Sequence, residues 1–173
     1  ELGKYKGVQR IDVLPIDTTF YNLAKRSPVF TEINLEALND EKIKRIEGSA
    51  FRYLNNLKGH YDVIFIDVPD PTDLEINQYY TQEFYHLCHR ALKNEGLMIA
   101  QSGSPYYATK AFYAISKTIE SADFNILPLH NQIMTLGEWG WIIGSKTLSA
   151  VQLKERCSQL EFENIETRWI NNP

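Results

Sequence analysis

The sequence predicts an α/β protein built on an open, mostly parallel sheet that is flanked by helices. Strand-like runs rich in β-branched residues alternate with helix-like runs along the chain, as is typical of such sheets. In addition, residues 61–67 (YDVIFID) and 97–100 (LMIA) contain runs of consecutive apolar residues. Runs of this kind are expected for strands that helices cover on both faces.

The first half of the chain is expected to contain three strands and two helices. The run VQRIDVL is stopped by a proline, and Thr18 or Thr19 is placed to cap the helix that follows. The dipeptide Ser27-Pro28 ends this helix, because the residue before a proline disfavours helical backbone. A second helix shows apolar residues at helical spacing. We expect strands at residues 8–14, 43–46 and 61–67, and helices at residues 18–25 and 49–57.

The second half repeats the alternation. One helix carries an apolar stripe and is followed by Gly96, which precedes the second strongly apolar strand. The later elements are another amphipathic helix, two final strands and a C-terminal helix. We expect helices at residues 81–92, 109–122 and 151–160, and strands at residues 97–100, 124–129 and 139–144.

Composition narrows the class of protein. The 173 residues are enough for one domain, which we expect to span residues 1–173. With 18 Lys and Arg against 22 Asp and Glu, the net charge of −4 offers no electrostatic footprint for nucleic acid.

No apolar run reaches the roughly 18 residues that a membrane span requires. Cys88 and Cys157 are expected to be reduced thiols. Because the chain begins at Glu1 rather than Met, we expect a fragment of a longer protein.

Acidic and polar side chains follow the two apolar strands. Asp67-Val68-Pro69-Asp70-Pro71 leaves the first of them, and Gln101 ends the second. Ligands of open α/β sheets bind beyond the carboxyl ends of the strands. Two carboxylates there can hold a cation or take a proton from an amine. The alternative is structural, because Asp-Pro pairs are common in turns.

These segments resemble a known family. YDVIFIDVPDP, followed by YYTQEFYHLCHRALKNEGLMIAQSGSP, is similar to the spermidine synthases, the polyamine aminopropyltransferases, and the likeness runs from about residue 7 to residue 146. The resemblance implies a Rossmann-like methyltransferase fold. It implies transfer of an aminopropyl group from decarboxylated S-adenosylmethionine to putrescine, which gives spermidine and methylthioadenosine. The donor is then a co-substrate, and no tightly bound cofactor is expected.

The resemblance also implies roles for particular residues. Asp67 is the acid/base residue at the attacking amine, and Asp70 lies by the substrate amines or the aminopropyl arm. Gln101 helps to line the polyamine site. Tyr79 or Tyr80 adds a hydroxyl; we take Tyr79 as the candidate, although the sequence does not choose between the two.

The donor pocket departs from the family pattern. The family's Gly-rich turn and first strand should precede Glu1, so we expect this chain to lack both. Pro15 stands where the family has an acidic residue for the ribose, which leaves Asp17 as the candidate there. Ser49 stands at the position of the acidic residue near the adenine amino group, and Pro71 packs near the adenine. Weak donor binding is therefore expected of this chain by itself.

The C-terminal part departs as well. The family's Tyr-Pro-Ser-Gly loop is replaced by TLGEWG, which removes a polyamine-site tyrosine and leaves Glu138 as a candidate anion. The GEWGW run and the insert at residues 27–40 most resemble bacterial members in which this domain follows transmembrane helices. On that interpretation the parent lies in the cell membrane and this domain is cytoplasmic. The expected partners are a small diamine and a nucleoside donor, with a homodimer left open.

Other residues have simpler interpretations. His86 and His89 are three residues apart, but such pairs on amphipathic helices are mostly surface residues, so no metal site is predicted. The glycines at 137, 140 and 144 are expected to permit close packing. Trp139 and Trp141 share one face of a strand and are expected in the core.

Two further functions stay open beside aminopropyl transfer. One is a degenerate domain of the same fold that binds a polyamine or nucleoside without turnover, which Pro15 and Ser49 favour. The other is an S-adenosylmethionine-dependent methyltransferase, which the Asp-x-x-Asp-Pro loop fits less well.

Overall fold

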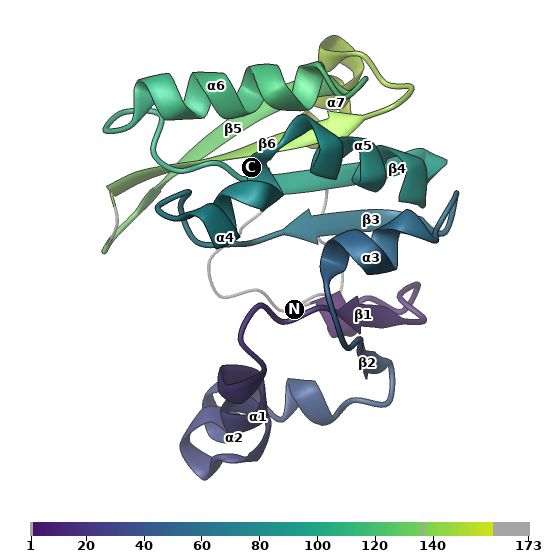
Figure 1. The fold of residues 1–173 in the computed structure, drawn as a ribbon, viewed down its shortest axis with the longest axis vertical. Coiled ribbons are helices and arrows are strands. Elements are labelled where there is room, and N and C mark those ends of the chain that lie inside the picture. Colours follow the sequence, from purple (N-terminus) through teal and green to yellow (C-terminus); the bar gives the residue numbers. More distant parts are fainter. Residues whose placement is uncertain (1, 136, 161–173) are drawn as a thin grey trace. The chain divides into compact units, whose positions relative to one another are not determined.

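The computed structural model describes residues 2–135 and 137–160 (Figure 1). The chain divides into two compact units, the first up to Ala50 and the second Phe51–Leu160. That these units form a single domain stays a prediction. Over the described ranges, no helix has both the length and the apolar character that a membrane crossing requires.

The first unit contains a small sheet and a pair of helices. Its two strands are parallel, with Ile11 opposite Ile43. Phe20 and Phe30 stack edge to face, which holds the two helices together. The elements of this unit are η1 (Leu2–Lys4), β1 (Ile11–Val13), α1 (Thr18–Arg26), α2 (Pro28–Asn34), η2 (Ala37–Asn39) and β2 (Ile43–Arg45).

The start of α1 differs from the expectation. Asp17, rather than Thr18 or Thr19, caps the helix: its Oδ1 accepts hydrogen bonds from the backbone amides of Thr19 at 2.8 Å and Phe20 at 3.0 Å. A carboxylate one residue before the helix satisfies two of the otherwise unpaired amides of the first turn. The predicted end is confirmed, since α1 stops at Arg26 and Pro28 opens α2.

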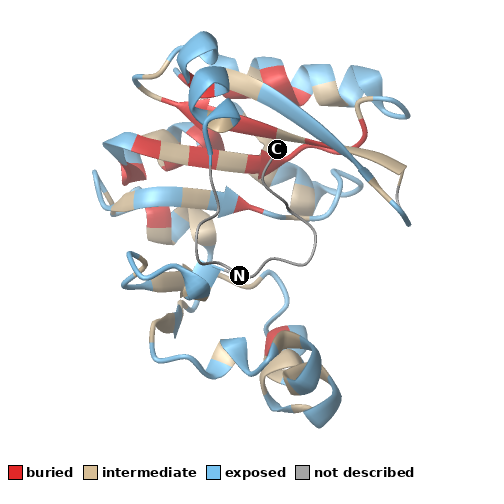
Figure 2. Ribbon diagram, turned by 180° about the vertical axis from the view of Figure 1, so that it is seen from behind, coloured by how far each residue is buried: buried red, intermediate tan, exposed pale blue. Residues whose placement is uncertain are grey.

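The second unit is a four-stranded sheet with helices on both faces. The strands lie in the order β3-β4-β6-β5. Helices α5 and α6 pack side by side on one face, and α7 packs against β5 from the other face (Figures 1 and 2). The elements are α3 (Ala50–Asn55), β3 (Tyr61–Ile66), α4 (Leu74–Asn77), η3 (Gln78–Tyr80), α5 (Gln82–Ala91), β4 (Leu92–Gln101), α6 (Thr109–Glu120), β5 (Asn125–Ile133), β6 (Gly137–Ser145) and α7 (Ala150–Ser158).

The predicted α/β class is confirmed, but the strand directions are mixed. Strands β3 and β4 are parallel, whereas β6 runs antiparallel to both β4 and β5. Only residues 134–136 separate β5 from β6, and so short a connection can join antiparallel neighbours but not parallel ones. The sheet is therefore less parallel than expected, because its last two strands form a hairpin.

The core follows the middle of this sheet. Figure 2 shows the buried residues concentrated along β4 and β6, including Met98, Ala100 and Ile142, which are fully buried. The expectation that β3 is covered on both faces is wrong for the second unit. Val63 and Phe65, which share one face of β3, are 42% and 50% exposed. Apolar sequence alone identified the strand but not which of its faces a helix covers.

Two glycines of β6 allow close packing, as expected. A Cβ at Gly140 would lie 2.4 Å from Phe112 Cε2 of α6 and 3.0 Å from the carbonyl oxygen of Gly103. A Cβ at Gly144 would lie 2.9 Å from the ring of Phe124. The amide of Gly140 also donates to the carbonyl of Gly103 at 2.8 Å, which ties β6 to the loop after β4.

Replacing Gly140 by alanine is therefore expected to destabilise the protein. Overpacking a tight contact costs about 1–3 kcal/mol in the free energy of unfolding, and each kcal/mol lowers the melting temperature by roughly 2–4 °C at this size. Calorimetry on the full-length protein measures the shift. Gly7→Ala is the control, because no other atom lies within 4 Å of the added Cβ. Equal melting temperatures for the two variants contradict the prediction.

Candidate active site

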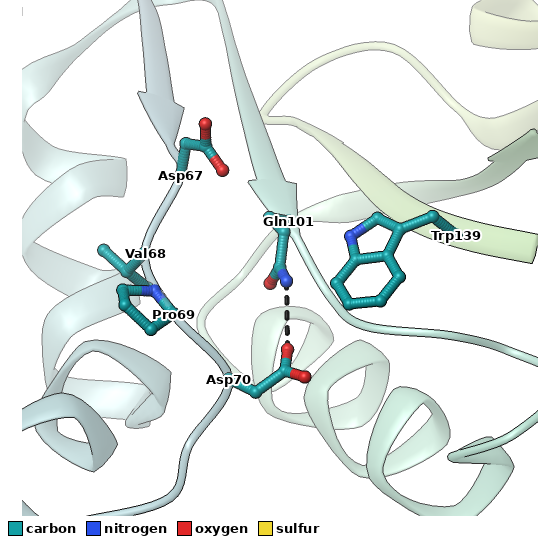
Figure 3. Close-up of a pocket in the computed structure, with 6 residues that line it drawn as sticks. All are labelled: Asp67, Val68, Pro69, Asp70, Gln101 and Trp139. Carbon is teal, nitrogen blue, oxygen red and sulfur yellow. Dashed lines mark hydrogen bonds between the residues drawn. The ribbon is translucent and has the colours of Figure 1, made fainter. Parts of the chain in front are cut away.

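The loop that leaves β3 and the end of β4 together form a cleft in the second unit (Figure 3). Its volume of about 440 Å³ is within the range of small-molecule sites. Strand β6 supplies the opposite wall. The residues that line the cleft are Asp67, Val68, Pro69, Asp70, Gln101 and Trp139.

Asp70 is held in place by Gln101. The Nε2 of Gln101 donates a hydrogen bond to Oδ1 of Asp70 at 3.0 Å (Figure 3). Gln101 is the last residue of β4 and only 6% exposed, so it brings a rigid donor to an otherwise exposed carboxylate. Gly103 lies next to the same oxygen: its φ of +73° suits glycine, and a Cβ there would stand 3.6 Å from Oδ1 of Asp70.

Tyr80 supports the loop and Gln101 together. Its hydroxyl is 3.0 Å from Oε1 of Gln101, 3.0 Å from the carbonyl oxygen of Pro69 and 3.3 Å from that of Val68. Burial, with the charges of Asp70 and Asp67, raises the pKa of Tyr80 above its ordinary value. The hydroxyl therefore keeps its proton and acts as a donor.

Asp67 contrasts with Asp70. It directly follows β3, is exposed, and lines the cleft. Among the described residues, no side chain forms a hydrogen bond or ion pair with its carboxylate. Figure 3 shows both carboxylates on the side of the loop that faces Gln101. The cleft thus combines one carboxylate fixed by a hydrogen bond with another that has no side-chain partner among the described residues.

The opposite wall comes from β6, and it corrects two expectations. Trp139, expected in the core, lines the cleft. Glu138, expected at the polyamine, is not among the residues that line it. Successive residues of a strand face opposite sides of the sheet, and Glu138 forms an ion pair with Nδ1 of His130 at 2.6 Å, across the β5–β6 hairpin.

The two candidate tyrosines are also separated by the structure. The ring of Tyr79 packs against Phe51 and Phe84, with centroids 6.3 and 5.2 Å away. It is not among the residues that line the cleft, whereas Tyr80 reaches Gln101. Tyr79 is therefore placed as a packing residue, and Tyr80 is the tyrosine connected to the carboxylate loop.

The donor-site candidates belong to both units, and each is described within its own unit. In the first unit, the carboxylate of Asp17 is engaged in capping α1, and Ser49 is exposed. In the second unit, Pro71 follows Asp70 on the exposed part of the loop and does not line the cleft.

Sequence reasoning found Asp67, Asp70 and Gln101, which the structure brings together, and missed Trp139. The sequence placed Trp139 in a strand, but it did not show which face of that strand borders the cleft. The described ranges also contain no group of three or more His, Cys, Asp or Glu side chains placed to hold a metal ion. What the cleft offers is anionic and aromatic: carboxylates attract an ammonium group, and an indole face adds cation–π attraction.

Comparison with known proteins agrees with this chemistry. Residues 1–155 match the model of the spermine/spermidine synthase domain. The polyamine aminopropyltransferase of Oceanobacillus iheyensis is 36% identical over 146 residues, which are 84% of this chain and 28% of that protein. Polyamine aminopropyltransferase 2 of Aquifex aeolicus is 33% identical over 97% of this chain and 32% of that protein. The chain therefore spans about a third of the length of these relatives.

Solved structures show the same fold. A spermidine synthase in complex with the transition state analogue AdoDATO gives a TM-score of 0.80 at 23% identity, over 97% of this chain and 57% of that one. Spermidine synthase from Thermotoga maritima gives 0.77 at 24% identity, over 97% and 56%. With the matched domain covering most of its residues, the chain belongs to the spermine/spermidine synthase family.

Proposed function

We propose that the protein is a polyamine aminopropyltransferase that moves an aminopropyl group from decarboxylated S-adenosylmethionine to putrescine. The observation that carries the proposal is the pair of carboxylates after β3, one free and one held by Gln101, in a chain of this family. A diamine is a cation in water and must lose a proton before it can attack carbon. The cleft offers one carboxylate to bind the cation and another to accept the proton.

In the proposed reaction the amine nitrogen attacks the aminopropyl carbon that is bonded to the donor's sulfonium sulfur. A carbon–nitrogen bond forms, the carbon–sulfur bond breaks with its electron pair going to sulfur, and methylthioadenosine leaves. The surplus proton of the amine passes to Asp67, which is free to accept it. Asp70, fixed by Gln101, binds the ammonium end of the diamine through a charge-assisted hydrogen bond.

A second function is kept because two observations favour it. The carboxylate of Asp17 is engaged in capping α1, and Ser49 carries no charge. One oxygen of the ribose candidate is thus committed to the helix cap, and the adenine candidate is not an acid. A domain that binds polyamine or nucleoside without turnover is consistent with that arrangement. A homodimer and a membrane-anchored, cytoplasmically oriented parent stay predictions from the resemblance.

An assay of the full-length protein tests these alternatives. Putrescine and the decarboxylated donor are incubated with the enzyme, and spermidine and methylthioadenosine are quantified by chromatography. The proposal expects both products in equal amounts, and neither when putrescine is omitted. Binding of putrescine without product supports the non-catalytic function. Methylated product from S-adenosylmethionine itself indicates a methyltransferase.

A further inference from the structure

Tyr80 occupies a rigid position next to the carboxylate loop. It ends η3 and precedes Thr81, whose hydroxyl caps α5 by accepting a hydrogen bond from the amide of Phe84. Helix α5 is anchored in turn by side chains buried in the second unit: Phe84, Tyr85, Cys88 and Ala91. The Tyr80 side chain is therefore presented by a fixed helix start rather than by the loop that it contacts.

The contacts of this hydroxyl all lead to the cleft. Its three acceptors are Oε1 of Gln101 and the carbonyl oxygens of Val68 and Pro69. Both carbonyls belong to the loop segment between the two carboxylates. One hydroxyl proton shared among three acceptors ties the loop and the end of β4 to the start of α5.

The hydroxyl and Asp70 together set the orientation of the Gln101 amide. With Nε2 toward Asp70, the amide donates to the carboxylate and its Oε1 meets the hydroxyl donor of Tyr80. The reversed amide would point Oε1 at the carboxylate, placing two acceptors against each other. Because Gln101 is buried, leaving its oxygen without a donor carries a penalty.

We propose that Tyr80 is a positioning residue for the amine site, acting through Gln101 and the loop to hold the Asp70 carboxylate. This inference rests on the proposed function, which makes Asp70 the partner of the diamine. Tyr80 does not line the cleft and is assigned no contact with the substrate. Its effect should therefore appear in diamine binding and should depend on the charge of Asp70.

The first test compares two adjacent tyrosines in the full-length protein. Tyr80→Phe is expected to raise the KM for putrescine about tenfold, the equivalent of one lost hydrogen bond, with kcat changed less than about threefold. Tyr79→Phe removes the same atom from a ring that packs against Phe51 and Phe84, and should leave both constants unchanged. Equal kinetics for the two variants overturn the proposal, as does a loss confined to kcat.

The second test separates positioning from a general structural effect. If Tyr80 acts through Asp70, adding Tyr80→Phe to Asp70→Asn should change the KM by less than about twofold beyond the single Asp70 variant. A full further tenfold rise would mean that the hydroxyl acts independently of the carboxylate, which overturns the proposal. Thermal unfolding of all variants confirms that they are compared in the folded state.

Calorimetry measures the Kd for putrescine, alone and with methylthioadenosine present. This measurement distinguishes failure of the proposed function from failure of the positioning role of Tyr80. If the unchanged protein forms no spermidine but binds putrescine, the proposed function fails while the positioning role is still measured. In that case Tyr80→Phe should raise the Kd about tenfold and Tyr79→Phe should not. If the unchanged protein does not bind putrescine in either mixture, both inferences are overturned.

Discussion

Asp67→Asn is expected to abolish aminopropyl transfer in the full-length protein while leaving the fold intact. The residue is exposed at the end of β3, and in the described chain its carboxylate has no side-chain partner that the substitution could disturb. Asparagine keeps the shape of the side chain but cannot take a proton from the attacking amine. Loss of a general base typically lowers the rate about 10²- to 10⁴-fold, and here the loss should appear in kcat.

The matched control, Asp62, lies on the strand that precedes Asp67. Asp62 forms an exposed ion pair with Lys93, with Oδ2 2.8 Å from Nζ, and exposed pairs of this kind contribute little to stability. Asp62→Asn therefore makes the same chemical change in β3 without touching the cleft, and its turnover should match that of the unchanged enzyme. Steady-state rates at saturating putrescine and donor decide the matter. Near-normal turnover in Asp67→Asn removes the residue from its proposed role.

The residues at the strand ends were predictable because two general rules act on them together. Apolar runs mark buried strands, and ligands of α/β sheets lie beyond the carboxyl ends of those strands. Asp67 directly follows β3 and Gln101 ends β4, so neither rule required knowledge of the packing. The parallel pairing of β3 with β4 then brings the two ends together.

The residues contributed by β6 were not predictable in the same way. Glu138 and Trp139 are neighbours, and the side chains of a strand alternate between its two faces. A shift of one residue in the pairing of the strand would therefore exchange the side chain that reaches the cleft. That register is set by the hairpin, in which Gln132 is opposite Glu138 and Asn131 is opposite Trp139. The sequence identified the strand but did not specify its pairing or its direction.

The sequence did not choose between Tyr79 and Tyr80, for a related reason. Both tyrosines precede the capping residue of α5, and a helix start rotates successive side chains to different directions. One ring enters the aromatic cluster with Phe84 and the other reaches Gln101. The order of residues alone cannot distinguish these outcomes, because the partners of Tyr79 come from α3 and α5, and those of Tyr80 from the loop after β3 and from β4.

Asp70→Asn is expected to raise the KM for putrescine roughly 10- to 100-fold, since a hydrogen bond to a charged group contributes about 1.5–3 kcal/mol. The substitution isolates charge from position. The side-chain oxygen of asparagine can still accept the hydrogen bond that Gln101 donates to Oδ1 of Asp70 at 3.0 Å. Because a polyamine carries several ammonium groups and little apolar surface, its affinity should depend on this carboxylate more than on Trp139.

Ionic strength provides the second readout for Asp70. The carboxylate is exposed, and the field of an exposed charge is screened beyond about 8 Å at physiological salt. The KM of the unchanged enzyme should therefore rise with added salt, and Asp70→Asn should flatten that dependence. Glu138→Gln removes an equal charge that is paired with His130 rather than lining the cleft, so it should preserve both the KM and its salt dependence. If Asp70→Asn behaves like Glu138→Gln at low and high salt, the carboxylate only shapes the turn with Pro71, and the amine is bound elsewhere.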